Sequence, residues 1–313
     1  MIDAEKSRAT YMHIAQVQNS LVQHPGMNEL LMKFREAMHY RDCTGIPKNY
    51  LVYGPPGVGK STLRKCIEQE FPQITKDDRL LRPVLSVTIP SRPTIKNVAE
   101  EILAVLGDPC FAKGSSADKT HRIIHAVRDL GIKMFLFDEG QHFVEGGNKN
   151  TPREAADWLK VLIDTSRAST ILLGTEPVKK ILEANDQLRR RFSAVQELKP
   201  FSISSSKSAN EFAAIIRHVD RKLGLPNTID FSDSGLIGSL HYATNGVMDY
   251  IMKLLIEAYR LALEDGRTQI TRILLEEAFT QSIWVDGVGT MNPFNSKFVN
   301  KYLDYQNGMP FRK

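Results

Sequence analysis

The stretch Gly54-Pro55-Pro56-Gly57-Val58-Gly59-Lys60-Ser61 decides the fold of this 313-residue chain. It follows an apolar segment, residues 49–53, and opens a helix-like stretch, residues 62–70. A strand, a glycine-rich loop ending in Lys-Ser and a helix form the setting that a phosphate-binding P-loop requires. We therefore predict an α/β core that binds a nucleoside triphosphate. A chance Gly/Pro-rich turn is the alternative, and it leaves the agreement of strand, loop and helix unexplained.

Each position of the loop has a chemical reason. Glycines let backbone N–H groups close around the β-phosphate, Lys60 reaches the β- and γ-phosphates, and the Ser61 hydroxyl ligates Mg²⁺. The predicted nucleotide-binding residues are Gly54, Pro55, Pro56, Gly57, Val58, Gly59, Lys60, Ser61 and Thr62.

A second motif indicates hydrolysis. Residues 133–137 form an apolar run typical of a buried strand, and Asp138-Glu139 follow it directly, which is a Walker B pattern. Asp138 would hold the Mg²⁺ together with Ser61, and Glu139 would orient and deprotonate the attacking water. Two adjacent carboxylates can also be an ordinary solvated strand end. The upstream P-loop favours the catalytic interpretation.

Strand-like segments alternate with helical ones through the first two thirds of the chain, which predicts a parallel sheet covered on both faces. Residues 107–119 read as a loop before a helix over residues 121–130. Beyond Pro200 only helical periods remain. The predicted organisation is a helical N-terminal extension, a nucleotide-binding core, a helical lid and an irregular tail carrying Tyr302, Tyr305 and Phe311: residues 1–48, 49–202, 203–283 and 284–313.

Composition excludes several classes of protein. The three cysteines have no C-x-x-C spacing, so neither a disulfide framework nor a zinc site is indicated. No apolar stretch approaches the roughly 20 residues of a membrane span, and the first residues lack the apolar region of a signal peptide. We expect a soluble, cytoplasmic protein. The net charge of +5 permits nucleic-acid binding without demonstrating it.

Two further features indicate the kind of NTPase. Thr175 follows the predicted strand of residues 170–173, where its side chain could sense the γ-phosphate or position the water. One helix later, residues 187–192 contain three consecutive arginines. In AAA+ ATPases this position presents an arginine finger to the neighbouring subunit's nucleotide. We predict that Arg190 or Arg191 is the finger and that the protein oligomerises; a solvated helix end is the alternative.

Four segments together resemble the TniB/TnsC family of transposition regulators: residues 54–61, 137–142, 173–175 and 187–192. The resemblance implies an AAA+ ATPase of the initiator-like branch, with ATP and Mg²⁺ as cofactors, that assembles as rings or filaments around duplex DNA. It also implies partners: a target selector of the TniQ/TnsD type and a transposase of the TnsB/TniA type, with hydrolysis driving disassembly. In the family, residues after the Walker B acids can relay nucleotide state, so Gln141 could hold Glu139 toward or away from the water, whereas His142 is expected to be structural.

DNA bound in this way is held through its phosphates, without base readout. By analogy with the initiator-like branch, the predicted contacts lie on core loops: Arg92, Thr94, Lys96, Lys113, Lys119 and Thr120. Thr94 and Lys119 are predicted to begin helices, where backbone N–H groups could join in holding phosphate. Ordinary exposed surface charge is the alternative.

The chain departs from many AAA+ proteins in its predicted lid. Residues 245–250 offer no arginine after the glycine, and Lys253 is the nearest cation. This favours slow, switch-like turnover over a helicase or remodelling motor. A replication-initiator-like ATPase would share the predicted fold, and a small-molecule kinase would share the P-loop. The sequence leaves open the number of subunits per turn, the target-selection pathway, the transposase-binding surface and the choice among the arginines of residues 189–191.

Overall fold

The computed structural model describes residues 4–20, 22–145, 151–233 and 235–298, which form two compact units. One unit is Gln23–Lys199; the other combines Met1–Val22 with Pro200–Lys313. The predicted extension of residues 1–48 is thus divided. Helix α1 (Ala4–Asn19) shares the core of the helical unit, and α2 (Pro25–Thr44) belongs to the unit that contains the sheet.

The sheet has five strands, all paired in parallel, in the order β4-β5-β6-β1-β7. Their bounds are Val84–Thr88, Met134–Asp138, Ser169–Gly174, Asn49–Tyr53 and Phe192–Glu197. The predicted parallel α/β fold is confirmed. Because the strands are parallel, their carboxyl ends lie on the same side of the sheet. The P-loop after β1 and the carboxylates that end β5 therefore come together there, with the end of β6 between them.

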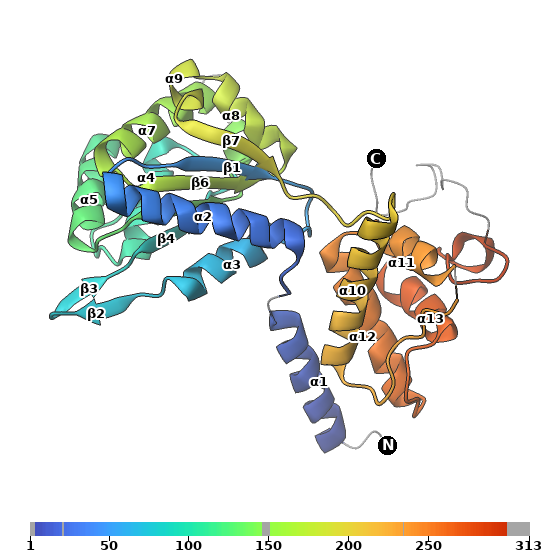
Figure 1. The fold of residues 1–313 in the computed structure, drawn as a ribbon. Coiled ribbons are helices and arrows are strands. Elements are labelled where there is room, and N and C mark those ends of the chain that lie inside the picture. The colour runs from blue at the N-terminus through green and yellow to red at the C-terminus, as the bar shows by residue number, and fades with distance from the viewer. Residues whose placement is uncertain (1–3, 21, 146–150, 234, 299–313) are drawn as a thin grey trace. The chain divides into compact units, whose positions relative to one another are not determined.

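Helices cover both faces of the sheet (Figure 1). Helix α2 packs beside α3 (Lys60–Glu70) on one face, and α4 (Ile95–Leu106), α5 (Ser116–Asp129) and α7 (Thr151–Ser166) pack together on the other. Strands β5 and β6 are correspondingly buried along their whole length. Short elements complete this unit: α6 (His142–Glu145), η1 (Glu176–Lys179), α8 (Lys180–Glu183) and α9 (Asp186–Arg189).

Two local features differ from the prediction. Helix α5 begins at Ser116, five residues before the predicted start, because Ser115 and Asp118 form a reciprocal capping box. A hairpin of β2 (Ile74–Lys76) and β3 (Arg79–Leu81) projects from the unit (Figure 1) and was not predicted, since its strands are only three residues long.

The helical unit contains α10 (Ser206–Leu223), α11 (Leu236–Thr244), α12 (Met248–Glu264) and α13 (Arg272–Ser282), in the part of the chain where only helical periods were found. The turn η2 (Gly289–Met291) follows, and Trp284 and Phe294 are buried in the core of this unit. Tyr302, Tyr305 and Phe311 lie outside the described residues. Among the described helices, none has the length and apolar character needed to cross a membrane.

Candidate nucleotide-binding and hydrolysis site

The P-loop connects the end of β1 to the start of α3, and its backbone requires glycine at Gly54 and Gly59. Gly54 donates its N–H to the carbonyl of Gly174 at 3.1 Å, and a Cβ at Gly54 would lie 2.4 Å from the backbone oxygen of Leu198. Gly59, directly before α3, has φ of +110°, a conformation that side chains with a Cβ rarely adopt. The backbone therefore forms the tight loop that the sequence predicted.

Lys60 lies inside this loop. Its side chain is buried, and Nζ donates to the carbonyl oxygens of Gly54 and Pro55 at 2.8 and 2.9 Å. Burial lowers the pKa of Lys60, while the nearby carboxylates of Glu139 and Asp138 act to raise it. The ammonium is thus placed between the loop and the Walker B acids, where a phosphate-binding lysine is needed.

The residues predicted to hold Mg²⁺ are adjacent. Ser61 Oγ donates to Asp138 Oδ2 at 3.3 Å, and Asp138 Oδ1 accepts from the backbone N–H of Glu139 at 2.9 Å. Hydroxyl and carboxylate oxygens are the donors that Mg²⁺ prefers, so the pair fits this ion. Sequence reasoning missed Arg64, whose Nε lies 3.5 Å from Asp138 Oδ2. Its spacing of three residues from Ser61, on the same helix face, was the available signal.

The predicted base and sensor are brought together by a residue between them. The Glu139 carboxylate accepts a hydrogen bond from Gln141 Nε2, and Gln141 Oε1 accepts one from the backbone N–H of Thr175 at 3.0 Å. His142 instead places Nδ1 2.8 Å from the carbonyl oxygen of Ile89, after the end of β4. Glu139, Gln141 and Thr175 therefore form one connected group.

The arginine cluster, residues 189–191, lies at the end of the sheet where β1 starts, whereas the P-loop lies where β1 ends. It directly precedes β7, whose first residue, Phe192, pairs with Asn49 at the start of β1. Asn49 is buried and donates from Nδ2 to the carbonyl of Arg191 at 2.9 Å. The five residues of β1 separate this end from the P-loop, a distance of roughly 16 Å at about 3.3 Å per residue.

Arg190 and Arg191 have different surroundings. Arg191 forms a two-point ion pair with Asp164, with Nε 2.6 Å from Oδ1 and Nη2 2.5 Å from Oδ2, and this raises the pKa of Arg191. Arg190 is exposed, and its side chain has no hydrogen bond or ion pair within the described part of the chain. Both line a cavity of about 510 Å³ that also includes Lys48 and Arg167.

The residues predicted to contact DNA divide into exposed and buried ones. Arg92, Thr94, Lys96 and Lys113 are exposed, and Thr94 caps the start of α4 by accepting from the N–H of Asn97. The prediction is wrong for Lys119 and Thr120, because both side chains are buried within the unit.

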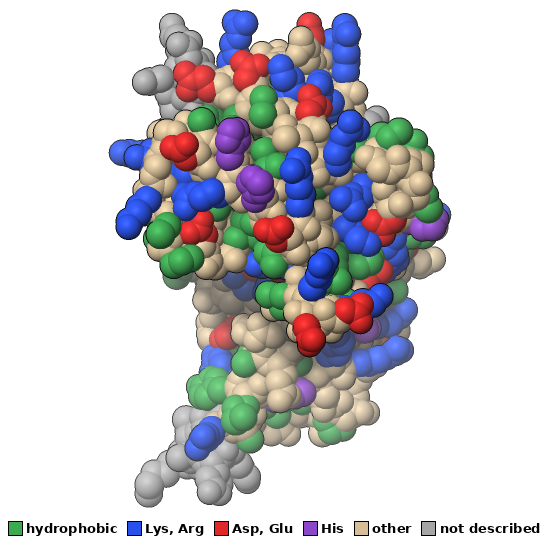
Figure 2. Space-filling view, turned by 90° about the vertical axis from the view of Figure 1, so that its left-hand side faces the viewer, with side chains coloured by type: hydrophobic (Ala, Val, Ile, Leu, Met, Phe, Trp, Pro, Cys, Tyr) green, Lys and Arg blue, Asp and Glu red, His purple; other side chains and the backbone are tan. Residues whose placement is uncertain are grey.

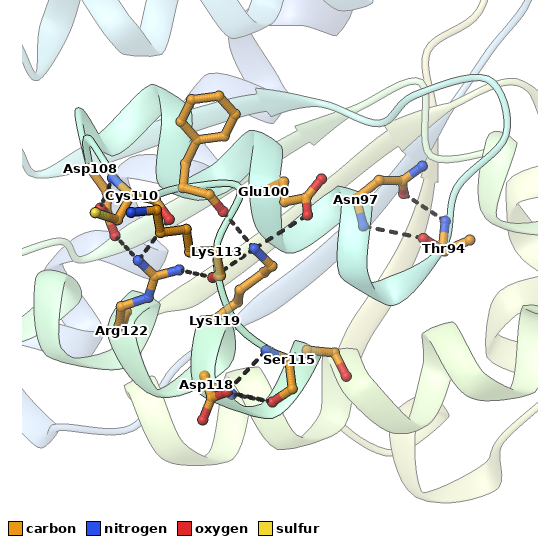
Figure 3. Close-up of polar contacts among 12 residues, drawn as sticks. Thr94, Asn97, Glu100, Asp108, Cys110, Lys113, Ser115, Asp118, Lys119 and Arg122 are labelled. Carbon is orange, nitrogen blue, oxygen red and sulfur yellow. Dashed lines mark hydrogen bonds and ion pairs between the residues drawn. The ribbon is translucent and has the colours of Figure 1, made fainter.

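Figure 3 shows why Lys119 faces inward: Nζ donates to the carbonyls of Phe111 and Lys113 at 2.7 and 2.9 Å and pairs with Glu100 at 3.2 Å. Lys119 lies in the first turn of α5, three residues beyond its first residue. Arg122 Nη2 donates to the same Lys113 carbonyl at 2.8 Å. These two cations tie the loop between α4 and α5 to the unit, so the exposed Lys113 side chain is carried by a fixed backbone.

Thr120 is also structural. Its hydroxyl donates to the carbonyl of Ser116 at 2.8 Å and accepts from Trp158 Nε1 at 3.0 Å. Over the face shown in Figure 2, Lys and Arg side chains are scattered among acidic and apolar ones and form no single patch. Net charge alone therefore does not locate a nucleic-acid surface.

The fold and the P-loop site together define an AAA+ P-loop NTPase. The family model described as "Bacterial TniB protein" matches residues 13–202, more than half of the chain. The chain therefore belongs to the TniB family. No curated protein matched in a direct sequence comparison.

Three solved structures illustrate the likeness in fold. The Aeropyrum pernix ORC1 protein, in complex with DNA, is 15% identical with a TM-score of 0.61; the match covers 84% of this chain and 66% of that one, just under two thirds. Cdc6p from Pyrobaculum aerophilum is 13% identical with a TM-score of 0.60, and the match covers 84% of this chain and 69% of that one. A Walker-type ATPase of Pyrococcus abyssi is 14% identical with a TM-score of 0.58, and the match covers 86% of this chain and 73% of that one. At these identities the likeness shows the fold alone.

The placement of Lys60 gives a direct test of nucleotide binding. Replacing Lys60 by Ala removes the cation that faces the phosphates, so we expect affinity for a fluorescent ATP analogue to fall at least about tenfold. Lys65→Ala is the matched control, because Lys65 is an exposed lysine on the same helix. Equal affinity of the two variants in a fluorescence titration would contradict the assigned site.

Proposed function

We propose that the protein hydrolyses ATP to ADP and phosphate. Glu139 accepts a proton from the attacking water, whose oxygen forms a bond to the γ-phosphorus as the bond to the bridging oxygen breaks and ADP leaves. Lys60 neutralises charge on the β- and γ-phosphate oxygens, and Thr175 lies at the end of the neighbouring strand. Ser61 and Asp138 would hold Mg²⁺, which supplies further charge neutralisation when bound.

The observation that carries this proposal is the position of the arginine cluster. Strand β1 starts beside the arginines and ends at the P-loop. The arginine side chains of a subunit are therefore about the length of β1 away from the nucleotide site of the same subunit. They can complete a hydrolytic site only on another copy of the chain. We infer an assembly of identical subunits in which each supplies an arginine to its neighbour.

Arg190 is the better candidate for that role. A finger must be available to a neighbouring phosphate, and Arg190 is exposed without a polar partner for its side chain among the described residues. Arg191 is held by Asp164 on its own α7, and the same pairing keeps the turn before β7 in place. We assign Arg190 as the finger and Arg191 as its support.

Membership of the TniB family supports a more specific role. We propose that the subunits assemble in their ATP-bound state on duplex DNA in the bacterial cytoplasm. The side chains of Arg92, Lys96 and Lys113 would contact the phosphates of the DNA. The assembly would link a TniQ/TnsD-type target selector to a TnsB/TniA-type transposase, and hydrolysis would dismantle it. The ORC1 structure in complex with DNA makes an initiator-like DNA-associated ATPase the second candidate.

The helical unit supports slow turnover. Lys253, the cation nearest to the glycine turn of residues 245–247, pairs with Asp249 on its own helix at 2.8 Å and lies over the ring of Tyr250. It is therefore engaged locally, and this turn supplies no arginine for a γ-phosphate. Such a protein would act as a switch that stays assembled until hydrolysis.

Mixing variants tests the arginine in trans. Arg190→Ala should bind ATP normally yet hydrolyse it about 10³-fold more slowly, because the transition-state charge loses its partner. Arg189→Ala is the control, since Arg189 is exposed and pairs with Asp186. An equimolar mixture of Arg190→Ala and Glu139→Gln subunits should regain hydrolysis, with the second supplying the finger to the first.

If the mixture hydrolyses ATP no faster than either variant alone, the finger does not act between subunits. Wild-type hydrolysis by Arg190→Ala would remove the assignment to that residue.

Salt dependence tests the DNA contact. Lys113→Ala should weaken binding to duplexes of unrelated sequence to the same extent and reduce the slope of log affinity against log salt by about 1 per subunit. Lys180→Ala, an exposed lysine on α8, is the control. A filter-binding or anisotropy titration with an unchanged slope for Lys113→Ala would exclude Lys113 as a phosphate contact.

A further inference from the structure

Asp138 is a buried residue whose two carboxylate oxygens have different partners. It is 4% exposed. Oδ1 accepts from the backbone N–H of Glu139, so this oxygen is engaged by the chain directly after β5. Oδ2 is shared: Ser61 Oγ donates to it at 3.3 Å, and Arg64 Nε lies 3.5 Å from it. Because Ser61 and Asp138 are the residues that fit Mg²⁺, Oδ2 is the oxygen for which Arg64 and the metal would compete.

Arg64 reaches this oxygen from α3, the helix that begins in the P-loop. Helix α3 packs against β4 and β5, and Arg64 Nη1 donates to the hydroxyl of Ser86 on β4 at 3.2 Å. The Arg64 side chain is 23% exposed, and its Nε–H is buried without a hydrogen-bond acceptor among the described residues. The guanidinium is therefore held at one end by Ser86, while its Nε lies beside the carboxylate without a hydrogen bond to it.

This contact differs from a structural arginine pair of the same unit. Arg191 binds Asp164 at two points, at 2.6 and 2.5 Å, which is the geometry of a strong arginine–carboxylate pair. At 3.5 Å and without a hydrogen bond, Arg64 acts on Asp138 through its charge alone. Such a contact offsets the charge of a buried carboxylate, and another cation can replace it without breaking a hydrogen bond between the two side chains.

The other charged groups nearby leave this role to Arg64. Lys60 Nζ donates to the carbonyl oxygens of the P-loop, and among the described residues Arg64 is the cation that pairs with Asp138. Glu68, one turn further along α3, has its Oε1 4.0 Å from Arg64 Nη1. An arginine displaced from Asp138 therefore has a second acidic partner on its own helix.

We propose that Arg64 competes with Mg²⁺ for the carboxylate of Asp138 and thereby lowers the affinity of the nucleotide-bound protein for the metal. Two cations that share one carboxylate repel each other, and an arginine cannot relieve the repulsion by losing its proton. The inference rests on the proposed ATPase function, in which Ser61 and Asp138 hold Mg²⁺, and deepens it. Loss of the γ-phosphate removes ligands of the metal, so this competition would favour release of Mg²⁺ after hydrolysis.

Two other roles of Arg64 give different expectations. If Arg64 only braces α3 against β4 through Ser86, removal of its charge leaves the affinity for the metal unchanged. If Arg64 orients Asp138 toward the metal, its removal weakens metal binding. Competition is the role for which a variant without the charge binds the metal more tightly.

The effect of Mg²⁺ on ADP binding measures the metal affinity without hydrolysis. The Kd of the full chain for a fluorescent ADP analogue is determined in EDTA and in saturating Mg²⁺. The ratio of the value in EDTA to the value in Mg²⁺ reports the affinity of the nucleotide-bound protein for the metal. We expect this ratio to rise at least about threefold in Arg64→Gln and in Arg64→Met, because both lack the charge. The second variant serves where the first fails to fold.

Three variants keep the charge of Arg64 and are expected to leave the ratio within about twofold of the wild-type value. Arg64→Lys keeps a cation at the same position. Ser86→Ala removes the hydrogen bond to β4 without removing the charge. Arg35→Gln is the charge-matched control for Arg64→Gln, because Arg35 is exposed and pairs with Glu70 on the surface of this unit.

An unchanged or lower ratio in the folded Arg64→Gln and Arg64→Met variants would overturn the inference. Asp138→Asn separates this outcome from failure of the proposed metal site. If Asp138→Asn has the wild-type ratio, Asp138 does not contribute to metal binding, and the proposed site fails together with the inference. If the ratio falls in Asp138→Asn but does not rise in the Arg64 variants, only the role of Arg64 is removed.

Discussion

Parallel pairing of β6 between β1 and β5 is the constraint on which the site depends. It brings the P-loop, the Walker B carboxylates and Thr175 to one edge of the sheet from segments spread over more than 100 residues of sequence. Backbone hydrogen bonds across that edge, from Gly54 to Gly174 and from Gly140 to Leu173, then set the distances within the site. The side chains add chemistry to a geometry that the backbone has already determined.

Strand β1 also connects the turn that carries the arginines to the P-loop. β1 begins at Asn49, whose amide holds the turn that carries the arginines, and ends just before Gly54, where the P-loop begins. Strand β1, paired on both sides, separates the arginines from the P-loop of the same subunit. Under the proposed function, that separation would make hydrolysis a property of the assembly.

Much of the core could be predicted because its signals are local. The P-loop, the run into Asp138-Glu139 and the helical periods of the lid each specify their element without knowledge of the rest of the chain. Lys119 shows the limit: a lysine beside a Gly/Ser-rich loop resembles an exposed cation, and only the partner Glu100 on another helix and the carbonyls of Phe111 and Lys113 explain its burial. The pairing of Arg191 with Asp164 was invisible for the same reason, because it joins residues 27 apart in sequence.

Electron microscopy of the purified protein with duplex DNA, in ATP or a slowly hydrolysed analogue and in ADP, tests directly whether the subunits assemble on DNA with the arginines of one against the nucleotide of the next. We expect rings or filaments on DNA in the triphosphate state alone, with the arginines of one subunit against the P-loop of its neighbour. Monomers in every nucleotide state, or assemblies in which the arginines do not meet the neighbouring P-loop, would contradict this expectation.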